Sequence, residues 1–265
     1  MISPSSRPWL VFALIAAWFP GVASWAIELK PGETQAIGRK IWQNECAGTV
    51  DGLTSWNKGE TFASLGIGHF IWYPPGQEGP FDESWPKLIA FMKGRGVSIP
   101  GWLLTTPDCP WATREAFVAD FQSARMRELR TFLAGSIETQ TAFVVQRLQE
   151  ALPKMTASVA VRERKRLERN FDTVAQTGSG VYALIDYVNF KGEGIKEEER
   201  YQGQGWGLAQ VLLEMEGRPE GQAASVEFGR AATRVLTRRV KNAPKDESRW
   251  LAGWSNRCAT YGKPL

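Results

Sequence analysis

The hydrophobic pattern changes period close to Gly48, and this change restricts the chain to folds that join a helix directly to a small sheet. In residues 34–46, side chains of one face recur every four residues and end on Glu45, a spacing typical of an α-helix. In residues 51–72, the chain reads as two extended segments around a turn at 57–59. The pattern predicts a helix followed by a β-hairpin.

Helical periodicity dominates the rest of the chain, and we expect a mainly α (α+β) fold with a helical lobe and a small N-terminal β-hairpin. The polar, glycine-rich segment 189–205 is predicted to be a loop. Further helices are predicted at residues 82–95, 113–133, 136–151, 158–175, 179–188, 206–216, 222–240 and 246–260.

Residues 1–26 are predicted to be a secretory signal peptide. Arg7 precedes an apolar run at 9–19, and small residues follow it up to a cleavage site near Ala26. An uncleaved membrane anchor is the alternative, but the run is short for a membrane-spanning helix. We therefore expect a periplasmic or secreted protein that is not held at the membrane after cleavage. Residues 27–265 have the length of a single domain.

Composition excludes several classes of protein and site. With 43% hydrophobic and 23% charged residues, the chain is not a disordered protein. Charges of both signs are mixed along it, so no basic stripe for nucleic acid is present. A single His excludes a His-rich metal site, and three Cys lack metal-ligand spacing. The sequence therefore indicates no cofactor and no metal, and it identifies no protein partner.

The three cysteines are Cys46, Cys109 and Cys258. Outside the cytoplasm, two of them could form a disulfide, which would leave one free thiol, and the sequence does not say which two. We favour Cys109 with Cys258, because Cys46 directly follows the candidate catalytic residue described next.

Glu45 is the first candidate catalytic residue. It stands at the C-terminal end of its helix, where the helix dipole disfavours an anion, and partial burial disfavours an anion further. Both effects favour a protonated carboxyl, which a general acid needs. The periodicity is equally compatible with an exposed residue in the last helical turn.

The second half of the hairpin adds an acid, a hydroxyl and two glycines. If residues 60–69 form one strand, Glu60, Ser64, Gly66 and Gly68 share a face. Glycines within a strand mark the close approach of a ligand to the backbone, or else a bulge or tight packing.

The order of these residues resembles the lysozyme superfamily. Phage-type lysozymes carry Thr-x-Gly-x-Gly-His in a hairpin after a helix-terminal catalytic Glu, and residues 64–69 read Ser-Leu-Gly-Ile-Gly-His after Glu45. The pair Glu60 and Ser64 is also similar to the acid and Thr of chitosanases in that superfamily. The resemblance covers residues 41–72. It departs from the phage-type pattern at Lys58, where those enzymes have an Asp.

The resemblance implies a lysozyme-like fold and a glycosidase in which Glu45 protonates the leaving oxygen. Glu60, with Ser64 positioning water, is the first candidate for the base, and Asp51 is the second. A lytic transglycosylase would need Glu45 alone. The only histidine, His69, is expected to support the site structurally by contacting a carboxylate or a backbone group.

An exported enzyme of this kind would act on peptidoglycan as a muramidase-like hydrolase. Removal of Arg7 lowers the net charge from +4 by one, which still favours an anionic or neutral glycan over the polycationic substrate of a chitosanase. A non-catalytic cell-wall glycan-binding protein is the alternative outside enzymes. The residues expected to contact sugar or peptide groups are Trp56 and Trp72 on the hairpin and Asn189, Lys191, Glu193 and Gln204 opposite it.

Overall fold

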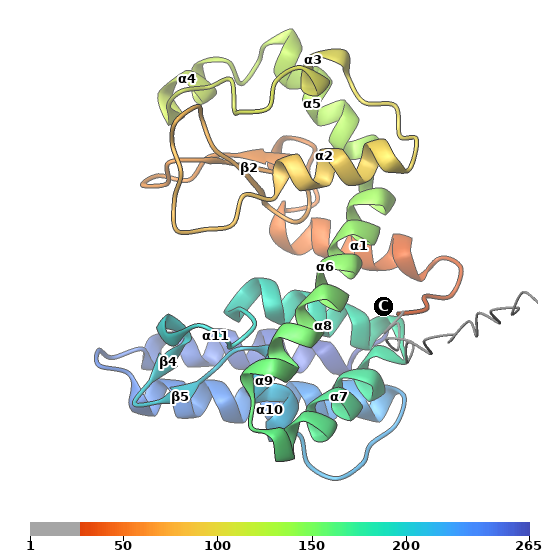
Figure 1. The fold of residues 1–265 in the computed structure, drawn as a ribbon, viewed down its shortest axis with the longest axis vertical. Helices are drawn as coiled ribbons and strands as arrows, with labels where there is room; N and C mark the ends of the chain where they lie inside the picture. The colour runs from red at the N-terminus through yellow and green to blue at the C-terminus, as the bar shows by residue number, and fades with distance from the viewer. Residues whose placement is uncertain (1–26) are drawn as a thin grey trace, which may run out of the picture.

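The computed structural model describes residues 27–265, and most of this part of the chain is helical, with two small antiparallel sheets. The predicted signal peptide lies outside the described residues. Figure 1 shows two groups of elements joined by the long helix α6 (Ile137–Ser158). We call residues 51–135 the sheet lobe and residues 161–262 the helical lobe. The mainly α class predicted from the sequence is confirmed.

Helix α1 (Glu33–Glu45) lies between the lobes and packs against α6 and α8 (Gly178–Lys191). Its apolar face is buried through Ile37 and Ile41, as the spacing predicts. The chain leaves the helix directly after Glu45 through three residues, of which Gly48 has a φ of +66°. Glu45, the last residue of α1, contacts both lobes, through Arg257 of the helical lobe and His69 of the sheet lobe.

The sheet lobe begins with a three-stranded antiparallel sheet in the order β1-β2-β3. After the 3-10 turn η1 (Asp51–Leu53) come the strands β1 (Thr54–Ser55), β2 (Ala63–Leu65) and β3 (Phe70–Trp72). Ser64 pairs with Ser55 on one side and with Ile71 on the other.

The predicted single strand over residues 60–69 is wrong. The chain turns at Gly66–His69, with φ values of +66° at Gly66 and +46° at His69. Glu60 precedes β2, so the two glycines do not share a strand face with Glu60 and Ser64. Backbone that adopts positive φ leaves the extended conformation, which is why period-2 alternation fails across this segment.

The sheet lobe is completed by four helices, two of which the sequence predicted as one. Helix α2 (Trp85–Gly94) has Pro86 in its first turn, as predicted. The helix expected at 113–133 is interrupted, because Ser123 accepts a hydrogen bond from the Met126 amide and starts a new helix there. The remaining helices of this lobe are α3 (Gly101–Leu104), α4 (Arg114–Ala119) and α5 (Ala124–Gly135).

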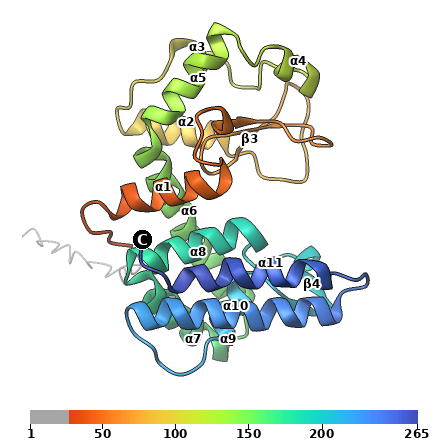
Figure 2. The same ribbon diagram turned by 180° about the vertical axis from the view of Figure 1, so that it is seen from behind.

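The helical lobe surrounds α8, in which every residue from Val181 to Tyr187 is buried. The segment 189–205, expected to be a loop, is partly ordered into secondary structure. Helix α8 continues to Lys191, and a short hairpin follows (Figure 2). The other elements are α7 (Val161–Ala175), η2 (Glu197–Glu199), β4 (Arg200–Tyr201), β5 (Gln204–Gly205), α9 (Leu208–Glu214), α10 (Gln222–Asn242), α11 (Ser248–Ala259) and η3 (Thr260–Gly262).

The predicted disulfide between Cys109 and Cys258 is wrong, because all three cysteines are free and buried. Cys109 is held in the sheet lobe, where its amide donates to the Tyr73 carbonyl oxygen, whereas Cys258 belongs to α11 in the helical lobe. Burial raises the pKa of each thiol to about 12.

None of the helices in residues 27–265 combines the length and apolar character that a membrane-spanning helix requires.

Candidate functional site

Glu45 forms an ion pair that joins the end of α1 to the helical lobe, so the expectation that its surroundings disfavour an anion is wrong. Its Oε1 accepts a hydrogen bond of 2.7 Å from the guanidinium of Arg257 on α11. The same guanidinium donates to both oxygens of Asp186 on α8, at 2.7 and 2.8 Å. The Glu45 side chain keeps 24% of its surface exposed, whereas that of Asp186 keeps 3%. Glu45 is therefore the carboxylate of this group that a ligand can reach.

Asp186 is held by two tyrosines as well as by Arg257. The hydroxyls of Tyr261 and Tyr182 donate to it at 2.6 and 3.1 Å, and Asn44 in turn donates to the Tyr182 hydroxyl at 2.6 Å. Burial, followed by the charge of Asp186, raises the pKa of both tyrosines, so they remain neutral donors. We call Glu45, Arg257, Asp186, Tyr182 and Tyr261 the Glu45 cluster.

Arg257 carries a permanent charge within this cluster. Burial alone would lower its pKa, but the hydrogen bonds and charges of Asp186 and Glu45 outweigh burial and raise it. Its guanidinium also lies over the ring of Phe190, with 4.5 Å between its carbon and the ring centroid. Asp186 shares the guanidinium, so Glu45 faces a cation whose charge is already partly compensated.

The turn that follows β2 is fixed to the end of α1. His69 Nε2 lies 3.1 Å from the carbonyl oxygen of Glu45, and Cys46 Sγ donates to the Gly66 carbonyl oxygen at 3.6 Å. The contact of His69 with backbone agrees with the supporting position expected of it. The two halves of the sequence motif thus form one structural unit.

Both glycines of the motif have packing roles. The buried side chain of Gln140 accepts from the Ile67 amide at 3.0 Å and occupies the space that a Cβ at Gly66 would need. A Cβ at Gly68 would contact the ring of Phe70 at 2.6 Å. Of the three interpretations that the sequence left open, the structure supports tight packing.

Among the described residues, Asp186 is the one carboxylate that is linked to Glu45, and it is linked only through Arg257, which binds both. Neither Glu60 nor Asp51 shares a hydrogen bond or an ion pair with this group. Glu60 accepts from the Asn57 amide group at 3.1 Å in the turn before β2. Asp51, with 66% of its side chain exposed, pairs with Arg130 at 3.2 Å. Ser64 is buried in the central strand.

Trp56 and Trp72 do not form a sugar-binding surface, and this prediction is wrong. Trp72 has no exposed surface, donates to the Pro107 carbonyl oxygen and packs at 5.3 Å from the ring of Trp85. Trp56 is buried against Phe117. Burial of these large aromatic rings contributes to the stability of the small sheet lobe, and a buried ring has no free face on which a sugar could stack.

The four polar residues predicted opposite the hairpin lie in the helical lobe, in the last turn of α8, directly after this helix or in β5. The hairpin of β4 and β5 lies on the same side of the molecule as the three-stranded sheet (Figure 1, Figure 2). Asn189 and Gln204 are exposed, and Glu193 is half-buried, which raises the pKa of its carboxyl. Lys191 is linked to the Glu45 cluster through Phe190, because its Nζ lies over the same ring as Arg257, at 4.0 Å from the centroid.

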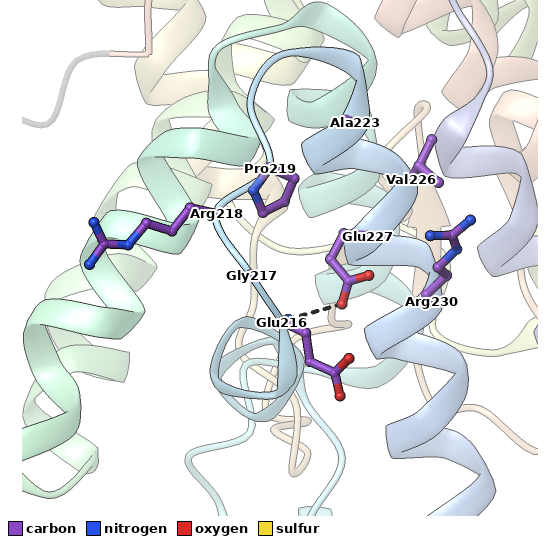
Figure 3. Close-up of a pocket in the computed structure, with 8 residues that line it drawn as sticks. All are labelled: Glu216, Gly217, Arg218, Pro219, Ala223, Val226, Glu227 and Arg230. Atoms are coloured by element: carbon purple, nitrogen blue, oxygen red, sulfur yellow. Dashed lines mark hydrogen bonds between the residues drawn. The ribbon is translucent and has the colours of Figure 1, made fainter.

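Glu45 lines neither of two surface hollows. One of about 560 Å³ is formed by the loop 216–219 and the start of α10, where Glu227 accepts from the Glu216 amide (Figure 3). Another of about 360 Å³ lies between α1 and the start of α6 and is lined by Arg39 and Trp42, among others. Neither includes a residue predicted from the sequence to be functional.

Sequence reasoning missed most of the Glu45 cluster. Arg257 is 212 residues away from Glu45, and Asp186 lies within a continuous buried helix. No local pattern links such positions, although a charged residue in an otherwise apolar helix, as at Asp186, is a general sign of a buried partner.

Comparisons with protein-family models, curated proteins and solved structures give no match. Within residues 27–265, the structure contains no group of three or more His, Cys, Asp or Glu side chains arranged to hold a metal ion.

Proposed function

We propose that the chain is a glycosidase of lysozyme-like fold that cleaves the glycan strands of peptidoglycan, with Glu45 as the general acid. The observation that carries the proposal is the contact between the two halves of the motif. His69 and Gly66, in the turn after β2, are bonded to Glu45 and Cys46 at the end of α1. This is the arrangement that a helix-terminal acid beside a Gly-x-Gly-His turn requires in the superfamily that the sequence resembles.

The position of Glu45 supports proton donation to a glycosidic oxygen. Its carboxyl is the accessible member of a cluster whose other carboxylate, Asp186, is already occupied by four hydrogen bonds. A glycosidic oxygen that reaches Glu45 replaces its contact with Arg257, and the guanidinium stays held by Asp186. Once Glu45 has taken a proton from solvent, it donates this proton to the leaving oxygen as the bond from that oxygen to the anomeric carbon breaks. A water molecule or a hydroxyl of the sugar itself then forms the new bond to the anomeric carbon and gives up its own proton.

A lytic transglycosylase is the second candidate, and the positions of Glu60 and Asp51 favour it. Neither residue belongs to the Glu45 cluster, and both are bonded to neighbours of their own. A hydrolase with two carboxylates needs one of them to activate water. A transglycosylase needs only Glu45, because a hydroxyl of the sugar itself serves as the nucleophile.

The predicted location of the protein supports the choice of peptidoglycan as the substrate. A periplasmic or secreted protein meets peptidoglycan directly, and residues 1–26 have the composition of a signal peptide. A chitosanase would favour an acidic surface for its polycationic substrate, which the basic net charge does not offer.

The test is an assay of the purified protein on peptidoglycan with reducing ends and anhydro-sugar ends measured separately. Glu45→Gln is expected to lower the rate by about a hundredfold or more. Glu150→Gln removes an exposed acid of α6 and serves as the matched control. Anhydro ends, together with full activity in Glu60→Gln and Asp51→Asn, identify the transglycosylase.

Two results would contradict the proposal. Activity that survives in Glu45→Gln would remove the general acid from the mechanism. Absence of turnover by the wild type on both peptidoglycan and chitosan would leave a glycan-binding protein as the remaining interpretation.

A further inference from the structure

Lys191 is a half-buried cation between two aromatic rings at the C-terminal end of α8. Its Nζ lies 3.6 Å from the ring centroid of Trp254 on α11 and 4.0 Å from that of Phe190. Both rings keep part of their surface exposed. The site therefore combines one ammonium with two partly accessible aromatic surfaces.

The other cations around Lys191 already have anionic partners. Arg239 on α10 donates to both oxygens of Glu247, at 2.8 and 3.0 Å, and Arg257 is bound to Asp186 and Glu45. In residues 27–265, Lys191 has neither an ion pair nor a side-chain hydrogen bond. Its ammonium is the charge of this group that an incoming anion can neutralise without displacing a carboxylate.

We propose that Lys191, Phe190 and Trp254 form a binding site for a carboxylate-bearing part of the glycan, next to Glu45 on the helical lobe. The ammonium pairs with the carboxylate, and the two rings contact the C–H groups of the adjoining sugar or peptide. The inference rests on the proposed function and narrows the substrate to peptidoglycan, whose peptides carry carboxylates, over neutral chitin or cationic chitosan.

The location agrees with this assignment. Lys191 and Arg257 both lie over the ring of Phe190, at 4.0 and 4.5 Å from its centroid, so the ammonium and the guanidinium of the Glu45 cluster share one aromatic ring. A glycan held at Glu45 therefore brings its side groups within reach of Lys191. The exposed side chain of Asn189 lies on the same last turn of α8 and offers further hydrogen bonds.

Carboxylate binding at Lys191 is expected to depend on pH. Burial, followed by the charge of Arg239, lowers the pKa of Lys191 to about 7, and the charge of Arg257 lowers it as well. Glu247 opposes this effect, but its own pKa is lowered by its bond to Arg239. The pKa of Cys258, also nearby, is about 12. Lys191 is thus the neighbouring group that loses its charge between pH 6 and 9, and affinity for a carboxylate falls over this range.

The test measures binding without turnover, in full-length protein carrying Glu45→Gln. One probe is a soluble disaccharide-peptide fragment of peptidoglycan, and the other is the same fragment with its carboxylates converted to methylamides. We expect Lys191→Met to bind the free acid at least about tenfold more weakly at pH 6, and the methylamide as well as the parent does. Lys191→Arg retains the preference for the free acid.

Equal affinity of the parent protein for the two probes would overturn the inference, as would a preference for the free acid that survives in Lys191→Met. Thermal unfolding of each variant checks that the variant is folded. The proposed function is tested separately by turnover. Turnover without a role for Lys191 contradicts this inference alone, whereas Lys191-dependent binding without turnover contradicts the glycosidase alone.

Discussion

At the scale of single residues, Arg257 organises the candidate site. It joins an accessible carboxylate to a buried one and so ties α1 to α8 and α11. Nothing in the sequence around Arg257 distinguishes it from the many other arginines of the chain. The position of Glu45 at the end of its helix, by contrast, could be predicted, because helical spacing is a local property. Its catalytic role stays a prediction.

Removal of Arg257 is expected to cost much more stability than removal of the charge of Glu45. Arg257→Leu leaves Asp186 buried without its cation, which costs about 3 kcal/mol or more of unfolding free energy. Glu45→Gln removes a partly exposed charge and keeps a hydrogen-bond acceptor for Arg257, so it costs about 1 kcal/mol or less. Urea unfolding of both variants measures the difference, and equal losses would contradict the central role given to Asp186.

Lys191 makes a testable contribution to the pH dependence of stability. Its pKa is about 7 in the folded protein and near 10.5 when unfolded, so the unfolded chain binds more protons between these values. The contribution of Lys191 to stability therefore rises with pH across this window. We expect Lys191→Met to be more stable than the wild type below pH 7 and the advantage to shrink towards pH 10.

Comparison with the wild type is needed because other groups act in the opposite direction. The buried thiols have pKa values of about 12 and stay protonated in the folded protein above pH 9, which lowers stability at high pH in both proteins. Chemical denaturation at several pH values provides the curves. A stability difference that does not change with pH would show that Lys191 is fully solvated.

At the scale of elements, the sequence predicted most helices correctly and misjudged the turns. The apolar face of α1 and the proline at the start of α2 are local signals, and both helices occur where expected. The break before α5 depends on the hydroxyl of Ser123, and the turn after β2 depends on Gln140, 73 residues away from its partner Ile67. A contact over such a distance along the chain cannot be predicted from a local sequence window.

The turn after β2 provides a matched pair of glycine substitutions. Gly59 and Gly66 both have positive φ, but a Cβ at Gly59 meets open space, whereas one at Gly66 meets the buried Gln140 side chain. Gly59→Ala is expected to cost about 1 kcal/mol for its backbone conformation alone. Gly66→Ala adds the displacement of Gln140 and is expected to cost at least about 2 kcal/mol.

Activity distinguishes these two variants further, because the turn carrying Gly66 is bonded to the end of α1. Gly66→Ala is expected to reduce turnover on peptidoglycan under conditions in which it is folded, and Gly59→Ala to leave turnover unchanged. Equal stability of the two variants would indicate that Gln140 moves away at no cost.

At the scale of the whole molecule, two lobes are joined by α6 and by α1, which packs against α8 and is hydrogen-bonded to the turn after β2 (Figure 1). The mainly α class and the place of the small sheet could be predicted from periodicity. The pairing of residues across the lobes could not, since it depends on how α1, α8 and α11 pack. The predicted pairing of Cys109 with Cys258 failed for the same reason: compartment and cysteine count say nothing about distance between lobes.

The state of the cysteines provides a direct test of this arrangement. Cys109 lies in the sheet lobe, Cys258 in the helical lobe, and Cys46 next to the end of α1. Unfolded under non-reducing conditions, the protein is expected to show three titratable thiols. In the native state at pH 8 the same thiols react slowly, because all are buried and a pKa of about 12 leaves almost no thiolate. A single thiol in the unfolded protein would show that a disulfide joins two of these cysteines, which is incompatible with the lobes as they are placed.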